Sequence, residues 1–136
     1  MERYTLKVYP AGMSRSVYRT IQISASETLD TLCRVIIGSF DFIDEHLYEF
    51  CMDNRMYSDY SYQSAPEPGE RSTRVKLEKL QLMKGQNFTL HYDFGDDWMF
   101  TIHVQKIEVE IEKSAPHVLK AKGEIEQYPS WDEWDE

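Results

Sequence analysis

The feature that most constrains the fold is a pair of alternating patterns on either side of a short acidic turn. Large apolar residues occupy every second position, namely Phe88, Leu90, Tyr92 and Phe94 before the turn and Trp98, Phe100, Ile102 and Val104 after it. Side chains on a strand point alternately to opposite faces, so the two sets share one buried face if Phe94 lies opposite Trp98. The alternation therefore predicts a β-hairpin with a three-residue loop at residues 95–97.

The hairpin is preceded by patterns in the order strand, strand, helix, strand. Alternation predicts strands over residues 4–9 and 17–23, and a run of large residues predicts a third strand over 46–52. Between them, the apolar spacing of residues 29–40 predicts one amphipathic helix, whose first free amides could be capped by Ser24, Ser26 or Thr28. We interpret this order as a β-grasp-like opening with one main helix packed on the sheet.

The rest of the chain predicts a long loop, a bulge and a tail. Residues 53–72 are rich in Tyr, Ser, Asp and Pro, which indicates a surface loop. Apolar positions change from even to odd after the hairpin, so a further strand at 107–111 should follow a bulge near Gln105 and Lys106. The expected fold class is a single α+β domain with a mixed or antiparallel sheet over residues 1–123. An acidic tail with two tryptophans follows at 124–136.

Length, charge and cysteine content argue against several classes of protein. A chain of 136 residues is typical of one domain. It has no apolar run of about 18 residues to span a membrane and no start typical of a signal peptide. The net charge is −9, with six acidic residues among the last fourteen, and lysine and arginine are too sparse to predict direct DNA binding. Two cysteines without zinc-binding spacing predict a cytoplasmic protein with no metal or cofactor.

Several short motifs occur in an order that is similar to a known family. They are Tyr18-Arg19-Thr20-Ile21, Thr28-Leu29 followed by Leu32, His46-Leu47-Tyr48-Glu49-Phe50, and Tyr92-Asp93-Phe94-Gly95-Asp96-Asp97-Trp98. Over roughly residues 4–123 the chain resembles the plasmid pRiA4b ORF-3-like family. The Tyr-Asp-Phe-Gly-Asp-x-Trp hairpin and the His-Leu-x-Glu-Phe strand are the most specific parts of this resemblance.

The resemblance implies a compact bacterial or archaeal α+β domain associated with plasmids and transposable elements, sometimes described as TnpR-like or resolvase-like. It implies no established activity. Many family members end in a stretch rich in glycine, cysteine and proline, and here residues 124–128 replace that stretch. Serine recombination needs an activated serine among clustered arginines and a basic DNA-binding helix, so the sequence argues against a resolvase.

The acidic turn is the first candidate site. Asp93, Asp96 and Asp97 could coordinate a divalent cation, because hard cations bind several carboxylate oxygens from one flexible loop. Aspartates beside a glycine also stabilise tight turns through side-chain to backbone hydrogen bonds, and we favour this interpretation. The neighbouring Trp98 is expected to anchor the core rather than to stack on a ligand.

Histidine and arginine residues give further candidates. His46 and Glu49 could form an acid/base pair, but an offset of three places them on opposite faces of a regular strand. Arg19 lies on the apolar side of its strand, and an inward arginine needs a partner for its charge. We therefore expect a salt bridge from Arg19 to Asp93 or Glu49.

Two further pairs are weaker candidates. His91 and His103 share the outer face of the predicted hairpin but lie diagonally across it, so a shared metal would need a third ligand. We expect both to be exposed polar residues of the sheet. Trp131 and Trp134, in the acidic tail, could recognise a basic groove on a partner, or they could dock on their own domain.

We predict an uncharacterised cytoplasmic domain that acts as a non-enzymatic protein-interaction module with an unknown protein partner. The sequence lacks a recognisable catalytic constellation, and its Tyr-rich loop and tryptophan-bearing tail favour binding to another protein. The alternative is a metal-assisted hydrolase or nucleic-acid-processing accessory that uses the turn at Asp93, Asp96 and Asp97. The oligomeric state stays open at this point.

Overall fold

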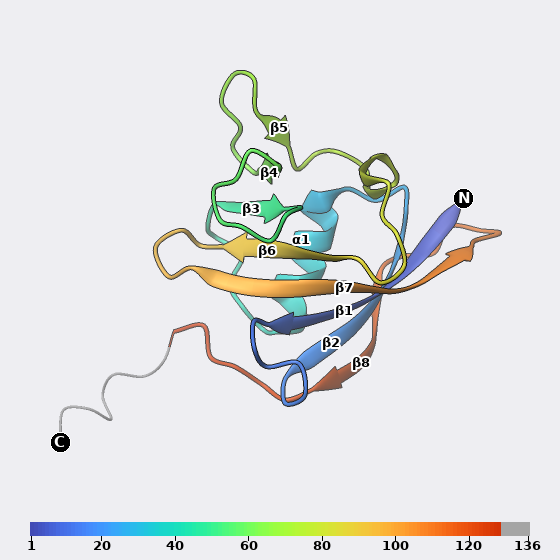
Figure 1. Cartoon of the computed structure of the whole chain (residues 1–136). Coiled ribbons are helices and arrows are strands. Elements are labelled where there is room, and N and C mark those ends of the chain that lie inside the picture. Colours follow the sequence, from blue (N-terminus) through green and yellow to red (C-terminus); the bar gives the residue numbers. More distant parts are fainter. Residues whose placement is uncertain (129–136) are drawn as a thin grey trace.

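The computed structural model describes residues 1–128 and shows one eight-stranded sheet with an α-helix against one face (Figure 1). The elements are β1 (Glu2–Pro10), β2 (Tyr18–Ser24), α1 (Leu29–Ser39), β3 (Tyr48–Cys51), β4 (Ser61–Gln63), β5 (Arg71–Ser72), the 3-10 helix η1 (Leu77–Leu80), β6 (Asn87–Tyr92), β7 (Trp98–Val109) and β8 (His117–Lys122). Their spatial order is β5-β4-β3-β6-β7-β1-β2-β8. Only the short β4–β5 pair among these described strands is parallel. In the described residues, neither helix combines the length and apolar character that a membrane span requires.

The prediction of a β-grasp-like fold with one main packed helix is wrong, because the protein is mostly a sheet. Strands account for 40% of the chain and helix for 12%. β3 pairs with β4 and β6 instead of joining the first hairpin, and β7 occupies the edge of β1. Local alternation identifies strands but does not specify which edges pair. The 12-residue strand β7 is long enough to pair with both β6 and β1.

The hydrophobic core lies between α1 and one face of the sheet. Thr28 caps α1, with its side-chain oxygen accepting a hydrogen bond from the Thr31 amide at 3.1 Å. The buried side chains of the helix are Leu29, Leu32, Cys33, Ile36 and Ile37. They pack within the same cluster as the even-numbered apolar residues of β6 and β7. Cys33 and Cys51 are both buried and free.

The central hairpin has a different register from the predicted one. Tyr92, not Phe94, lies opposite Trp98, so the loop is five residues long. Asp93 and Asp97 both have positive φ angles, 66° and 52°, which aspartate tolerates better than most residues. The predicted bulge is confirmed: Thr5 pairs with Lys106 and Leu6 with Val104, which leaves Gln105 as the extra residue.

A loop from the β3–β4 connection covers the outer face of the sheet near this hairpin. The ring of Tyr57 packs edge-on against His91 at 5.2 Å, and Phe94 lies 4.9 Å from the same imidazole. His91 and its cross-strand neighbour Glu49 are consequently fully buried. The prediction that His91 is an exposed polar residue is therefore wrong.

Arg19 is buried as predicted, but it does not bind Asp93 or Glu49. Its Nε atom donates to the Ser39 carbonyl at 2.8 Å. Its Nη1 atom donates to three more carbonyls, those of Tyr18, Lys122 and Gly123, at 2.9–3.0 Å. The guanidinium also lies 4.3 Å from the centre of the Phe40 ring. Backbone carbonyls from the end of α1 and of β8 thus replace the carboxylate that we expected, and burial lowers the pKa of Arg19.

Gly123, whose carbonyl accepts a hydrogen bond from Arg19, has no room for a side chain. Gly123 has a φ of +72°, and a Cβ atom there would overlap the Ser16 carbonyl oxygen. We predict that Gly123→Ala lowers the free energy of unfolding by about 3 kcal/mol, since strain at positive φ is joined by a backbone collision. Urea denaturation measures the difference.

Gly12→Ala is the matched control. Gly12 has a similar φ of +82° but no atom within 4 Å of an added Cβ, so its replacement should cost only about 1 kcal/mol. Equal losses in the two variants would contradict the close packing of Gly123 against Ser16.

Candidate functional site

The candidate site is a buried histidine held between two carboxylates at the closed end of the β6–β7 hairpin. Glu49 on β3 lies directly opposite His91 on β6. The Nδ1 atom of His91 is 2.7 Å from Glu49 Oε2, and its Nε2 atom is 2.6 Å from Asp97 Oδ1. We refer to these three residues as the Glu49–His91–Asp97 network.

The geometry of this network determines how its hydrogens are placed. An ionised carboxylate can only accept hydrogen bonds, so each imidazole nitrogen that faces one must donate. Both ring nitrogens of His91 face carboxylates, which matches an imidazolium between two anions. No ring nitrogen is then left with a lone pair to act as a base.

Glu49 is the most fully bound member of the network. Its Oε2 atom also accepts the Tyr57 amide hydrogen, and its Oε1 atom accepts one from Gln63 Nε2, both at 2.8 Å. Burial raises the pKa of Glu49, but the hydrogen bonds from His91, Tyr57 and Gln63 outweigh it and leave the pKa below its ordinary value. Glu49 is therefore a buried anion that holds the covering loop in place.

A second group surrounds His46 on the other side of the turn. His46 Nε2 lies 3.4 Å from Asp93 Oδ2 and 3.6 Å from Glu45 Oε1, and it also contacts the Tyr128 hydroxyl. Asp93 Oδ1 accepts the amide hydrogens of Gly95 and Asp96 at 3.0 and 3.3 Å. Asp93 thus closes the turn, as aspartate beside glycine is expected to do.

Tyr92 connects the sheet to the segment that carries His46. Its buried hydroxyl accepts hydrogen bonds from the amides of Glu45 and His46 at 2.9 and 3.2 Å. The same oxygen lies 3.0 Å from the Ile43 carbonyl and 3.1 Å from Asp44 Oδ1. Burial raises the pKa of Tyr92 to about 12, so the hydroxyl keeps its hydrogen at neutral pH.

The three aspartates of the turn do not converge on one point. Asp93 binds turn amides, Asp97 binds His91, and Asp96 lies exposed at the tip. Within residues 1–128, no group of three or more His, Cys, Asp or Glu side chains is arranged to hold a metal ion.

The structure separates the other predicted residues. Trp98 is partly buried, lies 4.9 Å from the Phe42 ring and packs against the core. His46 and Glu49 belong to different groups of hydrogen bonds, and His103 binds Asn87 on β6 instead of approaching His91. The tail residues, Trp131 and Trp134, lie outside the described residues.

Sequence reasoning missed Tyr57 and Gln63, and it treated His91 as exposed. Glu49 and His91 are 42 residues apart in the chain, and no sequence motif signals that they are neighbours. The available signal was a histidine placed between the large apolar residues Leu90 and Tyr92 of its strand.

Comparison with known proteins identifies the family of this chain. A profile described as plasmid pRiA4b ORF-3-like protein matches residues 2–127. The chain belongs to this family. The match covers every described strand and the helix, which confirms the resemblance found in the sequence.

Two similar proteins give no activity. The chain is 26% identical over 120 residues to an uncharacterized protein, y4hQ, of Sinorhizobium fredii (strain NBRC 101917 / NGR234), covering 87% of this chain and 61% of the relative. It therefore spans about three fifths of that relative's length. The crystal structure of a protein of unknown function, MM3350 from Methanosarcina mazei Go1, matches with a TM-score of 0.70 at 24% identity, over 88% of this chain and 69% of the other. This second match shows a shared fold.

Because the Glu49 carboxylate is a buried anion, we expect its contribution to stability to depend on pH. Glu49→Gln should lower the free energy of unfolding at pH 7 by about 3 kcal/mol, because it removes one partner of a buried ion pair. The pKa of Glu49 is lower in the folded state, so its contribution is present above the ordinary value of 4.5 and is lost as the pH falls through the folded value. Thermal unfolding of the wild type and of Glu49→Gln from pH 3 to pH 8 measures how the difference in stability between them changes with pH.

Glu108→Gln is the control for Glu49→Gln. Glu108 pairs with Arg3 and Lys106 at the surface, and such pairs contribute little to stability. Two outcomes would contradict the role given to Glu49. One is a Glu49→Gln variant as stable as Glu108→Gln at pH 7, and the other is a stability difference between the wild type and Glu49→Gln that grows as the pH falls.

The Tyr92 hydroxyl should be needed for the segment that carries His46. Tyr92→Phe leaves the amides of Glu45 and His46 without their acceptor, and we expect a loss of about 2 kcal/mol. Amide hydrogen exchange should accelerate at these two positions. Tyr60→Phe, at an exposed tyrosine, should change neither quantity, and unchanged exchange in Tyr92→Phe would refute the connection.

Proposed function

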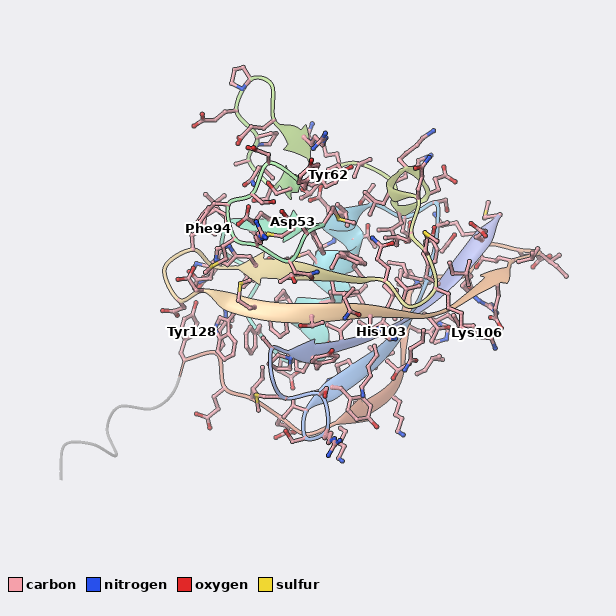
Figure 2. The ribbon with its side chains drawn as sticks, in the orientation of Figure 1. Asp53, Tyr62, Phe94, His103, Lys106 and Tyr128 are labelled. Carbon is pink, nitrogen blue, oxygen red and sulfur yellow. The ribbon has the colours of Figure 1, made fainter. Side chains whose placement is uncertain are left out.

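We propose that this protein is a non-enzymatic interaction module and that the closed end of the β6–β7 hairpin binds a basic, apolar segment of a protein partner. The observation that carries the proposal is the set of exposed apolar side chains at this end. Leu47, Tyr57 and Tyr128 are exposed by 56%, 63% and 48%. Figure 2 shows Phe94 and Tyr128 at the same end of the molecule.

Contacts place these side chains around the same turn. The Leu47 carbonyl accepts the Asp93 amide hydrogen, so Leu47 adjoins the turn. Tyr57 packs on Phe94 at 5.5 Å, and Tyr128 reaches Glu45 and His46. We call Leu47, Tyr57, Phe94, Asp96 and Tyr128 the hairpin-end surface.

Charge at the hairpin-end surface favours a basic partner. A hollow of about 330 Å³ opens beside Tyr128 and is lined by the carboxylates of Asp41, Glu124 and Glu126. Arg19 forms part of this hollow and offsets one of their charges. Exposed apolar side chains bordered by acidic groups suit an amphipathic, positively charged segment.

The closed histidine network supports a binding role over a catalytic one. A general base needs a free lone pair within reach of a substrate, and both His91 nitrogens already face carboxylates. The hydrolase alternative is less well supported, because Asp93, Asp96 and Asp97 do not converge on one point. The free, buried cysteines agree with the cytoplasmic setting that we propose. Because the family is named after a plasmid protein, we expect candidate partners among proteins that plasmids and other mobile elements encode.

Selection of a displayed random-peptide library on the full chain tests the proposal. We expect enriched peptides to combine Lys or Arg with large apolar residues, and fluorescence polarisation to give their affinities. Leu47→Asp and Asp96→Lys should each weaken binding about tenfold. Met83→Asp, the same kind of change at an exposed residue at the opposite end of the hairpin, should not. Acidic peptides, or affinities unchanged by Leu47→Asp and Asp96→Lys, would overturn it.

A further inference from the structure

A row of polar and basic residues crosses the outer face of the sheet, on the side opposite α1. From β8 to β6 the row runs through Lys120, Thr20, Lys7, His103 and Asn87, each opposite the next in strand register. Figure 2 places His103 on β7 in the middle of the sheet. At the usual spacing of neighbouring strands, the row is about 19 Å long. It could therefore contact a few units of an extended polymer.

Two tyrosine rings lie beside the basic part of this row. The Nζ atom of Lys7 is 4.6 Å from the centre of the Tyr18 ring and 5.7 Å from that of Tyr9. Lys120 Nζ, from β8, is 5.6 Å from the centre of the same Tyr18 ring. Cations and aromatic rings are thus interleaved on one open face.

Two lysines of this face keep their charge available. The ion pairs found in residues 1–128 involve neither Lys7 nor Lys120, whereas the nearby Lys122 donates to the Arg15 carbonyl at 2.7 Å. Lys120, with smaller effects from Lys122 and Lys7, lowers the pKa of Tyr18 although burial acts in the opposite direction. Two lysine ammonium groups thus lie close to one tyrosine ring on a chain whose net charge is −9.

Two adjoining hollows follow the row. The first has a volume of about 380 Å³ and is lined by Lys7, Tyr18, Thr20, Gln105, Leu119 and Lys120. The second, of about 530 Å³, includes Tyr9, Asn54, Asn87, Thr89 and Thr101 in its lining. Lys7 contacts the rings of both Tyr9 and Tyr18, so it joins the two. One end of the face is cationic, and the other offers amide and hydroxyl groups.

We propose that this face binds a short single strand of nucleic acid. Lys7 and Lys120 would hold phosphates, and the tyrosine rings would pack on bases. The side-chain nitrogen of Asn87, whose Oδ1 atom is bound to His103, would donate to a base edge. Single strands present phosphates and free flat bases together, and proteins bind them through basic grooves with aromatic side chains. A duplex hides its base faces, so the tyrosines would add nothing to its binding.

The sequence argued against direct DNA binding because its basic residues are sparse. Folding changes that assessment, since it brings Lys7 and Lys120, from opposite ends of the chain, to the same tyrosine ring, that of Tyr18. This inference concerns a different face from the hairpin-end surface and does not depend on the proposed function.

Fluorescence anisotropy of labelled eight-nucleotide oligo-dT and oligo-U with the full chain tests the proposal. We expect saturable binding to one or both, with a slope of log affinity against log salt of about −1.4 for the two phosphate contacts of Lys7 and Lys120. Lys7→Gln with Lys120→Gln should weaken binding at least tenfold and bring the slope close to zero. Lys76→Gln with Lys79→Gln removes the same charge from the exposed face of η1 and should leave binding unchanged.

A Tyr18→Leu variant and competition by three other anions test whether the face prefers a single strand of nucleic acid to other anions. Tyr18→Leu should weaken oligonucleotide binding about tenfold. Amide chemical shifts of the wild type should change on β1, β2 and β8, a readout that needs no variant. No saturation by either strand, unchanged affinity in the Lys7 and Lys120 variant, or equal competition by pyrophosphate, an eight-base-pair duplex or poly-glutamate would overturn the proposal.

Discussion

The structure depends on a buried charged contact that joins three separate parts of the chain. Glu49 from β3, His91 from β6 and Asp97 from the hairpin turn meet in one network, and the Tyr57 amide binds the same glutamate. Burying ions is costly unless they are paired and fully hydrogen-bonded, and this network meets both conditions. It fixes the hairpin turn and the covering loop together, which in turn positions the exposed apolar side chains of the hairpin-end surface.

The two faces of the sheet have different physical tasks. The inner face packs against α1 and supplies the hydrophobic core. The outer face is covered by the β3–β4 connection near His91 and stays open over β1, β2 and β8, where Lys7 and Lys120 lie. A closed polar network at one end and an open basic face at the other are consistent with a protein that binds partners at two surfaces.

The sequence predicted features that depend on neighbouring residues and failed on those that depend on distant ones. The bulge at Gln105 followed from a change of parity, and the burial of Arg19 followed from its position on an apolar side. The predicted register of the hairpin was wrong because Phe94 packs on Tyr57, which lies in a loop distant in the sequence. Arg19 found carbonyls at the end of β8 instead of a carboxylate, and no local pattern encodes such a pairing.

The protonation of His91 tests the central claim most directly. Long-range ¹⁵N–¹H correlation spectra of the imidazole ring at pH 7 report which nitrogens carry hydrogen. The account predicts hydrogen on both nitrogens, each bonded to a carboxylate, with the signals of both perturbed in Glu49→Gln. A neutral ring with one bare nitrogen would contradict the closed network and would make His91 available as a base.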